Sequence, residues 1–171
     1  TQSRSSAASD VYKRQISPYQ NRNPQISYNL RTVTIRLRDT LRPNTTYSIN
    51  FGNSLADLDE GNPYKNYSYV FSTGDHLDSM SVRGRVIMAE SGLADSTLQV
   101  YLYNEHLNDS TILKHRPQYA APVDGQGNYE VNHLPPGTYK AYVLKDNDGW
   151  RTYNNSSEFF AFLNGDSTFN F

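Results

Sequence analysis

The segment from residue 124 to residue 148 constrains the fold of this chain more than any other part of the sequence. Asp124, Gly125 and Gly127 indicate one tight turn, and the Pro-Pro-Gly motif at 135–137 indicates another. Apolar residues alternate with polar ones between and after these turns. The pattern predicts two short strands joined as a hairpin, as in small antiparallel β-sandwiches. The segment contains no nucleophile, general base or phosphate-binding loop.

Similar alternation recurs along the rest of the chain and predicts an all-β protein. Further strands are expected at 32–38, 46–51 and 67–71, with a short one near 25–28, and then at 81–88, 98–103, 118–123, 128–132, 138–145 and 158–163. The strands at 32–38, 46–51 and 67–71 are expected to bury one face and expose the other. A single helical turn is expected near 105–108.

Composition excludes several classes of function. The 171 residues include 14 tyrosines and no cysteine, so disulfides and thiolate metal sites are excluded. The formal net charge is −1 and no basic run is present, so nucleic acid is not predicted as a partner. No apolar run approaches the length that spans a membrane.

Two motifs resemble known families. The run G-N-Y-x-V-x-x-L-P-P-G-T-Y-K-A-Y-V-L-K-D, from Gly127 to Asp146, resembles transthyretin-like or carboxypeptidase-regulatory-like sandwiches of bacterial envelope proteins. Upstream, a second set resembles the S-layer-type bacterial Ig-like domain: Leu41-Arg42-Pro43-Asn44-Thr45-Thr46-Tyr47, then Asp57, Gly61-Asn62 and Phe71-Ser72-Thr73-Gly74. The resemblance implies a partial Ig-like sandwich followed by a transthyretin-like (prealbumin-like) antiparallel β-sandwich.

The predicted domains are 16–75 for the Ig-like part and 79–163 for the transthyretin-like part, with a C-terminal tail at 164–171. Residues 1–15 are set apart, because 5–15 resemble the translation of a sequencing adapter, as in metagenomic fragments. A disordered polar N-terminus is the alternative. On the adapter interpretation, early Ig strands, a signal peptide and a lipoprotein anchor would be missing.

Catalysis is not predicted. The four histidines, His76, His106, His115 and His133, lack metal-binding spacing, and no serine lies in a Gly-x-Ser-x-Gly motif. The transthyretin-like fold can host a hydrolase, but the C-terminal Tyr-Arg-Gly-Ser signature of those enzymes is missing. A hydrolase is therefore the least favoured function.

Asp146, Asp148 and Glu158 are the candidate metal ligands, and calcium is the candidate cofactor. Calcium takes six to eight oxygen ligands, and alternate carboxylates in a turn followed by a later glutamate supply several. The spacing is not that of an EF-hand, and Asn154 stands where related envelope loops usually have an aspartate. The alternative is a loop capped by Asx turns without an ion. Asp57, Asp59 and Glu60 form a weaker candidate.

Trp150 and Tyr153 are candidates for carbohydrate binding, because sugar rings stack on exposed aromatic faces. Tyr64 and Tyr67 are further candidates. Most tyrosines are instead expected at inward strand positions, in the core.

The predicted role is a non-catalytic cell-envelope module that acts as a spacer or protein-interaction surface, with a carbohydrate-binding accessory module as the alternative. Its partners would be proteins or glycans at the cell surface, or other domains of the parent chain. Five Asp-Ser/Thr tripeptides resemble an O-glycosylation acceptor of anaerobic Gram-negative bacteria, which indicates the periplasm or the outer-membrane surface; they begin at Asp39, Asp78, Asp95, Asp109 and Asp166.

Overall fold

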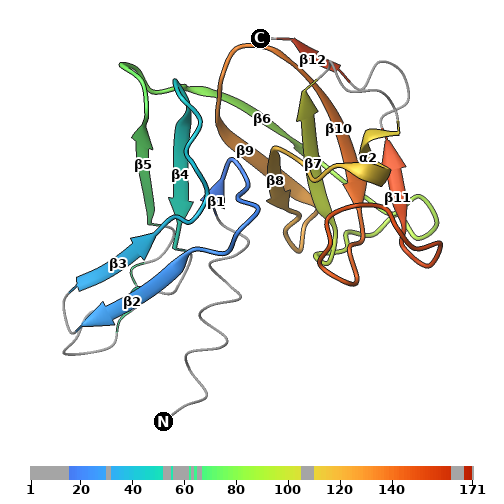
Figure 1. Cartoon of the computed structure of the whole chain (residues 1–171). Helices are drawn as coiled ribbons and strands as arrows, with labels where there is room; N and C mark the ends of the chain where they lie inside the picture. Colours follow the sequence, from blue (N-terminus) through green and yellow to red (C-terminus); the bar gives the residue numbers. More distant parts are fainter. Residues whose placement is uncertain are drawn as a thin grey trace. The chain divides into compact units, whose positions relative to one another are not determined.

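The computed structural model describes residues 16–29, 32–51, 55, 62, 64, 67–104, 110–162 and 168–170. The chain divides into two compact units, Thr1–Leu77 and Asp78–Phe171, each with its own sheets (Figure 1). The all-β prediction is confirmed, because every strand pairing is antiparallel and the described residues contain one helix, α2 (Thr111–Lys114). In the described part of the chain, no helix is long and apolar enough to cross a membrane.

The N-terminal unit contains a three-stranded sheet and a separate hairpin. The sheet has the order β1 (Ile16–Ser17), β4 (Thr46–Asn50), β5 (Ser68–Ser72), and the hairpin pairs β2 (Gln25–Asn29) with β3 (Thr32–Arg36). The buried core is small: Ile16, Ile49 and Phe51 form one cluster with partly buried apolar side chains around them, and Tyr47 is buried beside Phe71.

Hydrogen bonds join the two sequence motifs of this unit. The Thr73 hydroxyl donates to the carbonyl of Arg42 at 2.6 Å, and the amide of Thr45 donates back to that hydroxyl at 3.0 Å. The Tyr47 hydroxyl accepts from the amide of Arg42 at 2.9 Å, and the Tyr47 ring stacks on Phe71 with centroids 5.4 Å apart. The Thr-x-Tyr and Phe-x-Thr positions therefore hold the loop before β4 against the end of β5.

Burial along β5 is lower than the alternation suggests. Tyr69 lies opposite Ile49 in the register, yet Tyr69 is 52% exposed and Ile49 is 6% exposed. The expectation of an inward side chain is wrong for Tyr69, because β5 is the outer strand of its sheet and has a neighbouring strand on one side only. Tyr67 is also exposed, as stacking on a sugar ring would require.

The C-terminal unit has two antiparallel sheets. One contains β7 (Gln99–Asn104), β8 (Tyr119–Pro122) and β10 (Thr138–Leu144), with β11 (Phe160–Phe162) and β12 (Thr168–Asn170) both on the free side of β10. The other pairs β6 (Met80–Arg85) with β9 (Asn128–Leu134). Residues 168–170, expected in a tail, therefore form a strand of the main sheet.

The predicted hairpin at 124–148 is wrong, although its strands and turns are present. β9 pairs with β6, whereas β10 pairs with β7, β11 and β12, so the Pro-Pro-Gly turn carries the chain from one sheet to the other. Pro135 and Pro136 have no amide hydrogen, so a ladder cannot start beside this turn. His133, with φ of 60°, also departs from strand geometry just before it.

Two cores lie on opposite faces of the main sheet. Between the sheets, Val82 and Val131 pack with residues of β7, β8 and β10, among them Val100 and Leu102. On the outer face, Tyr101, Tyr103 and their neighbours form a second core with Ile112 of α2. Both faces of β7 are therefore covered.

The turn before β9 requires glycine at one position. Gly127 has φ of 91°, and a Cβ there would clash with the carbonyl oxygen of Val86. Gly125 has no atom within 4 Å of such a Cβ. Replacement of Gly127 is therefore strained by its backbone and blocked by its neighbour.

We expect Gly127→Ala to lower the free energy of unfolding by about 1–3 kcal/mol, because alanine disfavours this backbone conformation and contacts a carbonyl that cannot rotate away. Chemical denaturation measures the change. Gly125→Ala is the control and is expected to stay within about 0.5 kcal/mol of the parent. Equal effects of the two substitutions would contradict this account of the turn.

The two units are also expected to differ in stability. Residues 78–171 bury two clusters of large side chains, whereas the described part of residues 1–77 buries four apolar residues, Ile16, Tyr47, Ile49 and Phe51. Expressed separately, residues 78–171 should melt cooperatively and residues 1–77 should not. Calorimetry of both fragments tests this, and a cooperative transition of the 1–77 fragment would refute it.

Candidate functional site

The candidate site is the loop that follows β10 and ends at β11. The loop is closed at its base by the amide of Lys145, which donates to the carbonyl of Phe159 at 2.9 Å. In its middle, the amide of Tyr153 donates to the carbonyl of Ile112 at 2.9 Å. Tyr153 is also packed against the second core, so the loop and α2 together cover the outer face of the main sheet.

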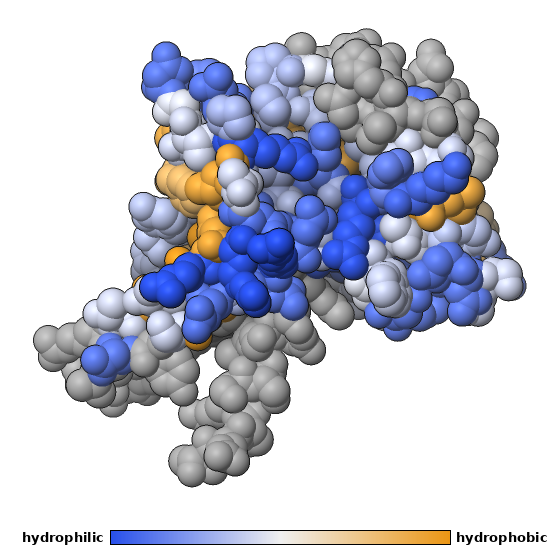
Figure 2. Space-filling view, viewed as in Figure 1, coloured by the Kyte–Doolittle hydropathy of each residue, from blue (hydrophilic) through white to orange (hydrophobic). Residues whose placement is uncertain are grey.

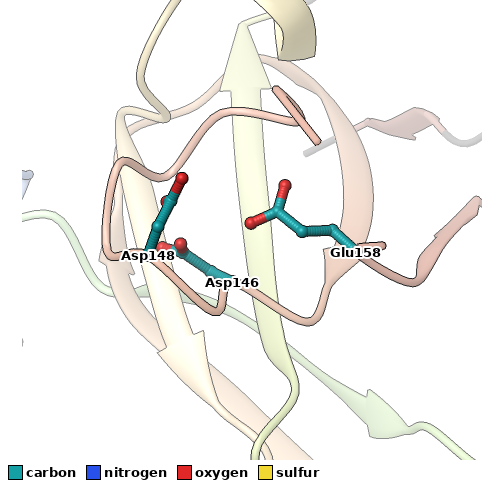
Figure 3. A group of neighbouring side chains, drawn as sticks. All are labelled: Asp146, Asp148 and Glu158. Atoms are coloured by element: carbon teal, nitrogen blue, oxygen red, sulfur yellow. The ribbon is translucent and has the colours of Figure 1, made fainter. Parts of the chain in front are cut away.

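The loop brings together the three predicted ligands. Asp146, Asp148 and Glu158 each offer one carboxylate oxygen, and these oxygens lie within 4.8 Å of one another. Figure 3 shows Glu158 reaching from the far end of the loop toward the two aspartates. Glu158 is 5% exposed, Asp146 is half-buried and Asp148 is exposed. The cluster is therefore open to solvent on the side of Asp148.

The Asp146 carboxylate accepts three hydrogen bonds. Its Oδ1 accepts from the amide of Gly149 at 2.7 Å, and its Oδ2 accepts from the amide of Arg151 and from the Tyr101 hydroxyl, both at 3.0 Å. Burial raises the pKa of Tyr101 far above its usual range, and the charge of Asp146 raises it further, against an opposing effect of Arg151. Tyr101 therefore remains a hydrogen-bond donor to this carboxylate at any ordinary pH.

Asp148 and Glu158 are oriented by Asn154 and by the backbone. The Asn154 side-chain amide donates to Asp148 Oδ2 at 3.0 Å, and its backbone amide donates to Glu158 Oε2 at 3.3 Å. The amide of Trp150 donates to Asp148 Oδ1 at 2.9 Å. This bond is the largest cause of the lowered pKa of Asp148, which is therefore ionised at neutral pH.

The Asx-turn alternative is thus present in the structure, since Asp148 accepts from the amide two residues later. It does not compete with cation binding, because each carboxylate oxygen has more than one lone pair. The side-chain nitrogen of Asn154 donates to Asp148. Asn154 therefore orients the candidate ligand Asp148 and is not itself a charged ligand. Three carboxylates so close together repel each other, and a divalent cation would reverse the sign of that interaction.

Trp150 and Tyr153 do not form a common aromatic platform. Trp150 is 59% exposed, with the Arg116 guanidinium 5.9 Å from the ring centroid. Tyr153 is partly buried and lies against Phe160, with centroids 5.6 Å apart. Of the two predicted glycan residues, only Trp150 therefore presents an open face.

The other candidates lie apart from this loop. His133 Nδ1 lies 3.1 Å from the carbonyl oxygen of Asp78, and His76 lies beside the exposed carboxylate of Asp75, so neither contact is to a serine. The weaker acidic candidates Asp57, Asp59 and Glu60, together with His106 and the predicted helical turn at 105–108, lie outside the described residues.

Sequence reasoning missed Tyr101. This residue lies 45 positions before Asp146 in the chain and was expected only as part of a strand. No local signal identifies it, since its contact with the acidic loop depends on the pairing of β7 with β10.

We expect Tyr101→Phe to lower the free energy of unfolding by about 1.5–3 kcal/mol, because it removes a hydrogen bond to a charged group. Tyr103→Phe is the matched control: its hydroxyl donates to the neutral carbonyl of His115 at 3.2 Å, and about 0.5–1.5 kcal/mol is expected. Urea denaturation of both variants gives the comparison. A smaller loss for Tyr101→Phe than for Tyr103→Phe would show that the Asp146 contact adds nothing.

Comparison with known proteins supports the Ig-like assignment of the N-terminal unit. In comparisons with curated proteins and with solved structures, no match is found for this chain. A family model described as a bacterial Ig-like domain matches residues 2–73. The match includes residues 5–15 and so gives the adapter interpretation no support. Bacterial Ig-like domains are generally non-enzymatic and occur in bacterial surface proteins. Residues 2–73 are thus similar to a bacterial Ig-like domain.

Proposed function

We propose that this protein is a non-catalytic module of the bacterial cell envelope that serves as a spacer or a docking surface. The observation that carries the proposal is the match of residues 2–73 to a bacterial Ig-like domain, a kind of domain suited to protein interaction. The second unit, a sandwich that we take to be transthyretin-like, is consistent with this role, because most of its described tyrosines are buried in two cores and so have a structural role. The Gram-negative periplasm or outer-membrane surface is the proposed location.

We also propose that the loop after β10 binds one calcium ion through Asp146, Asp148 and Glu158. The support is geometric: three oxygens within 4.8 Å of one another, on side chains already oriented by hydrogen bonds. Backbone oxygens and water would complete the six to eight ligands that calcium requires. Bound calcium would hold the start and the end of the loop together and so stabilise the cover of the second core.

With a neutral asparagine at 154, the affinity should fall in the range of extracellular calcium modules, with Kd of about 0.1–1 mM. At free calcium ten times Kd, the free energy of unfolding should rise by about 1.4 kcal/mol. Calorimetric titration and thermal melts in calcium and in chelator measure both quantities. Asp148→Asn should remove the calcium-dependent shift and leave the fold intact, because Asp148 is exposed.

Asp124→Asn is the matched control. Asp124 also accepts from backbone amides, those of Gln126 and Asn128 at 2.8 Å, but in a turn outside the loop. This variant should lose stability and keep the full calcium shift. If millimolar calcium gives no heat of binding and no shift in melting temperature, the loop is one capped by Asx turns without an ion.

Trp150 offers a direct readout of the site. It is the single tryptophan of the chain and follows Asp148 by two residues. Terbium bound in place of calcium should show emission sensitised by Trp150, and added calcium should displace it. Emission that persists in Asp148→Asn would place the ion elsewhere.

Carbohydrate binding is the second candidate function, and the exposed face of Trp150 is the observation in its favour. Arg116 lies over the same ring and would have to share it with a sugar. A hydrolase is a weaker alternative, because no serine of the chain lies in a Gly-x-Ser-x-Gly motif and the histidines lack metal-binding spacing.

A further inference from the structure

The C-terminal unit has an apolar groove that neither the core nor the acidic loop accounts for. The groove has a volume of about 300 Å³ and lies between residues 86–90, which follow β6, and residues 159–161 at the start of β11. In Figure 2, orange side chains gather at the right-hand margin, where β11 lies in Figure 1. The groove therefore lies at the side of the sandwich where the two sheets end.

The floor of the groove is continuous with the inner core. Leu98 is buried, and Val86, Met88 and Val143 are partly buried against the same cluster. At the rim, Ile87 is 52% exposed and Phe159 is 55% exposed. An exposed apolar rim around a core-lined groove is a feature of interaction sites in soluble proteins.

Glu90 is the one charged residue among the described residues that line the groove. It is exposed and makes no hydrogen bond or ion pair with any residue that the structure describes. Lys145 lies 5.9 Å from the centroid of the Phe159 ring at the rim, but its charge is paired with Asp95 at 3.0 Å. The mouth of the groove therefore carries one uncompensated negative charge.

The size and chemistry of the groove favour a peptide over a cofactor. Its volume is at the lower end of small-molecule sites, and it has one charged group instead of the several convergent polar groups that orient a cofactor. One or two large side chains of an extended segment would fill it. A neighbouring lysine or arginine of that segment would meet Glu90.

We propose that this groove docks an extended segment of a partner protein, through one large aliphatic or aromatic side chain next to a basic one. The inference rests on the proposed role as an interaction module and names the chemistry that the module recognises. It does not depend on calcium, because no lining residue belongs to the acidic cluster.

The test uses the full chain and fluorescein-labelled eight-residue peptides that alternate leucine with threonine and carry lysine, glutamine or glutamate at one central position. Fluorescence polarisation should show tightest binding for the lysine peptide. Ile87→Ser should weaken binding about tenfold by removing apolar contact at the rim. Leu93→Ser is the control, since Leu93 is 68% exposed and does not line the groove, and it should bind as the parent does.

A charge exchange tests the role of Glu90. Glu90→Lys should reverse the preference, so that the glutamate peptide binds about tenfold more tightly than the lysine peptide. Binding of all three peptides with equal affinity, or binding unchanged by Ile87→Ser, would overturn the proposal. A concentration-dependent dimer in sedimentation that Ile87→Ser abolishes would also overturn it, because the occupant would then be a second copy. Thermal melts of the same samples with and without calcium test the calcium site separately. A calcium-dependent shift in melting temperature without peptide binding would count against the groove and not against the calcium site.

Discussion

Burial of both faces of β7 and β10 is the constraint on which the C-terminal unit depends. Apolar and tyrosine side chains leave these strands on either side, and each face must be removed from water. The sheet β6–β9 covers one face, and α2 with the loop after β10 covers the other. The loop is therefore a structural layer of the unit as well as a connection. Its closure by Lys145 and Phe159 and its contact with α2 follow from that role.

The acidic cluster is coupled to this layer through Tyr101. The Tyr101 ring belongs to the outer core and its hydroxyl holds Asp146, so the position of a carboxylate and the packing of the sheet depend on one another. A buried tyrosine of this kind needs an acceptor, and a carboxylate is a strong one. The proposed ion would stabilise the same loop by balancing the negative charge of the three neighbouring carboxylates. Folding stability and ion binding would then be linked through a single loop.

The two units differ in how their edges are treated. In the N-terminal unit, β5 is an outer strand with tyrosines exposed along it, and the core beside it is small. In the C-terminal unit, β11 and β12 together line the free side of β10, and an apolar groove opens where the sheets end. Edges and their apolar side chains are where sheet proteins meet partners. A docking function is thus compatible with both units, although each would present a different surface.

The sequence by itself determined the all-β class, most strand positions and the composition of the acidic loop. These features are local: alternation with a period of two, turn residues, and carboxylates close together in the chain. Only the tertiary structure decided which strands pair, because one alternating pattern fits several partners and the sandwich selects among them. It therefore separated β9 from β10, exposed Tyr69 at an edge and joined Tyr101 to Asp146 across 45 positions. Burial on both faces of β7 likewise depends on a helix and a loop that no pattern within that strand encodes.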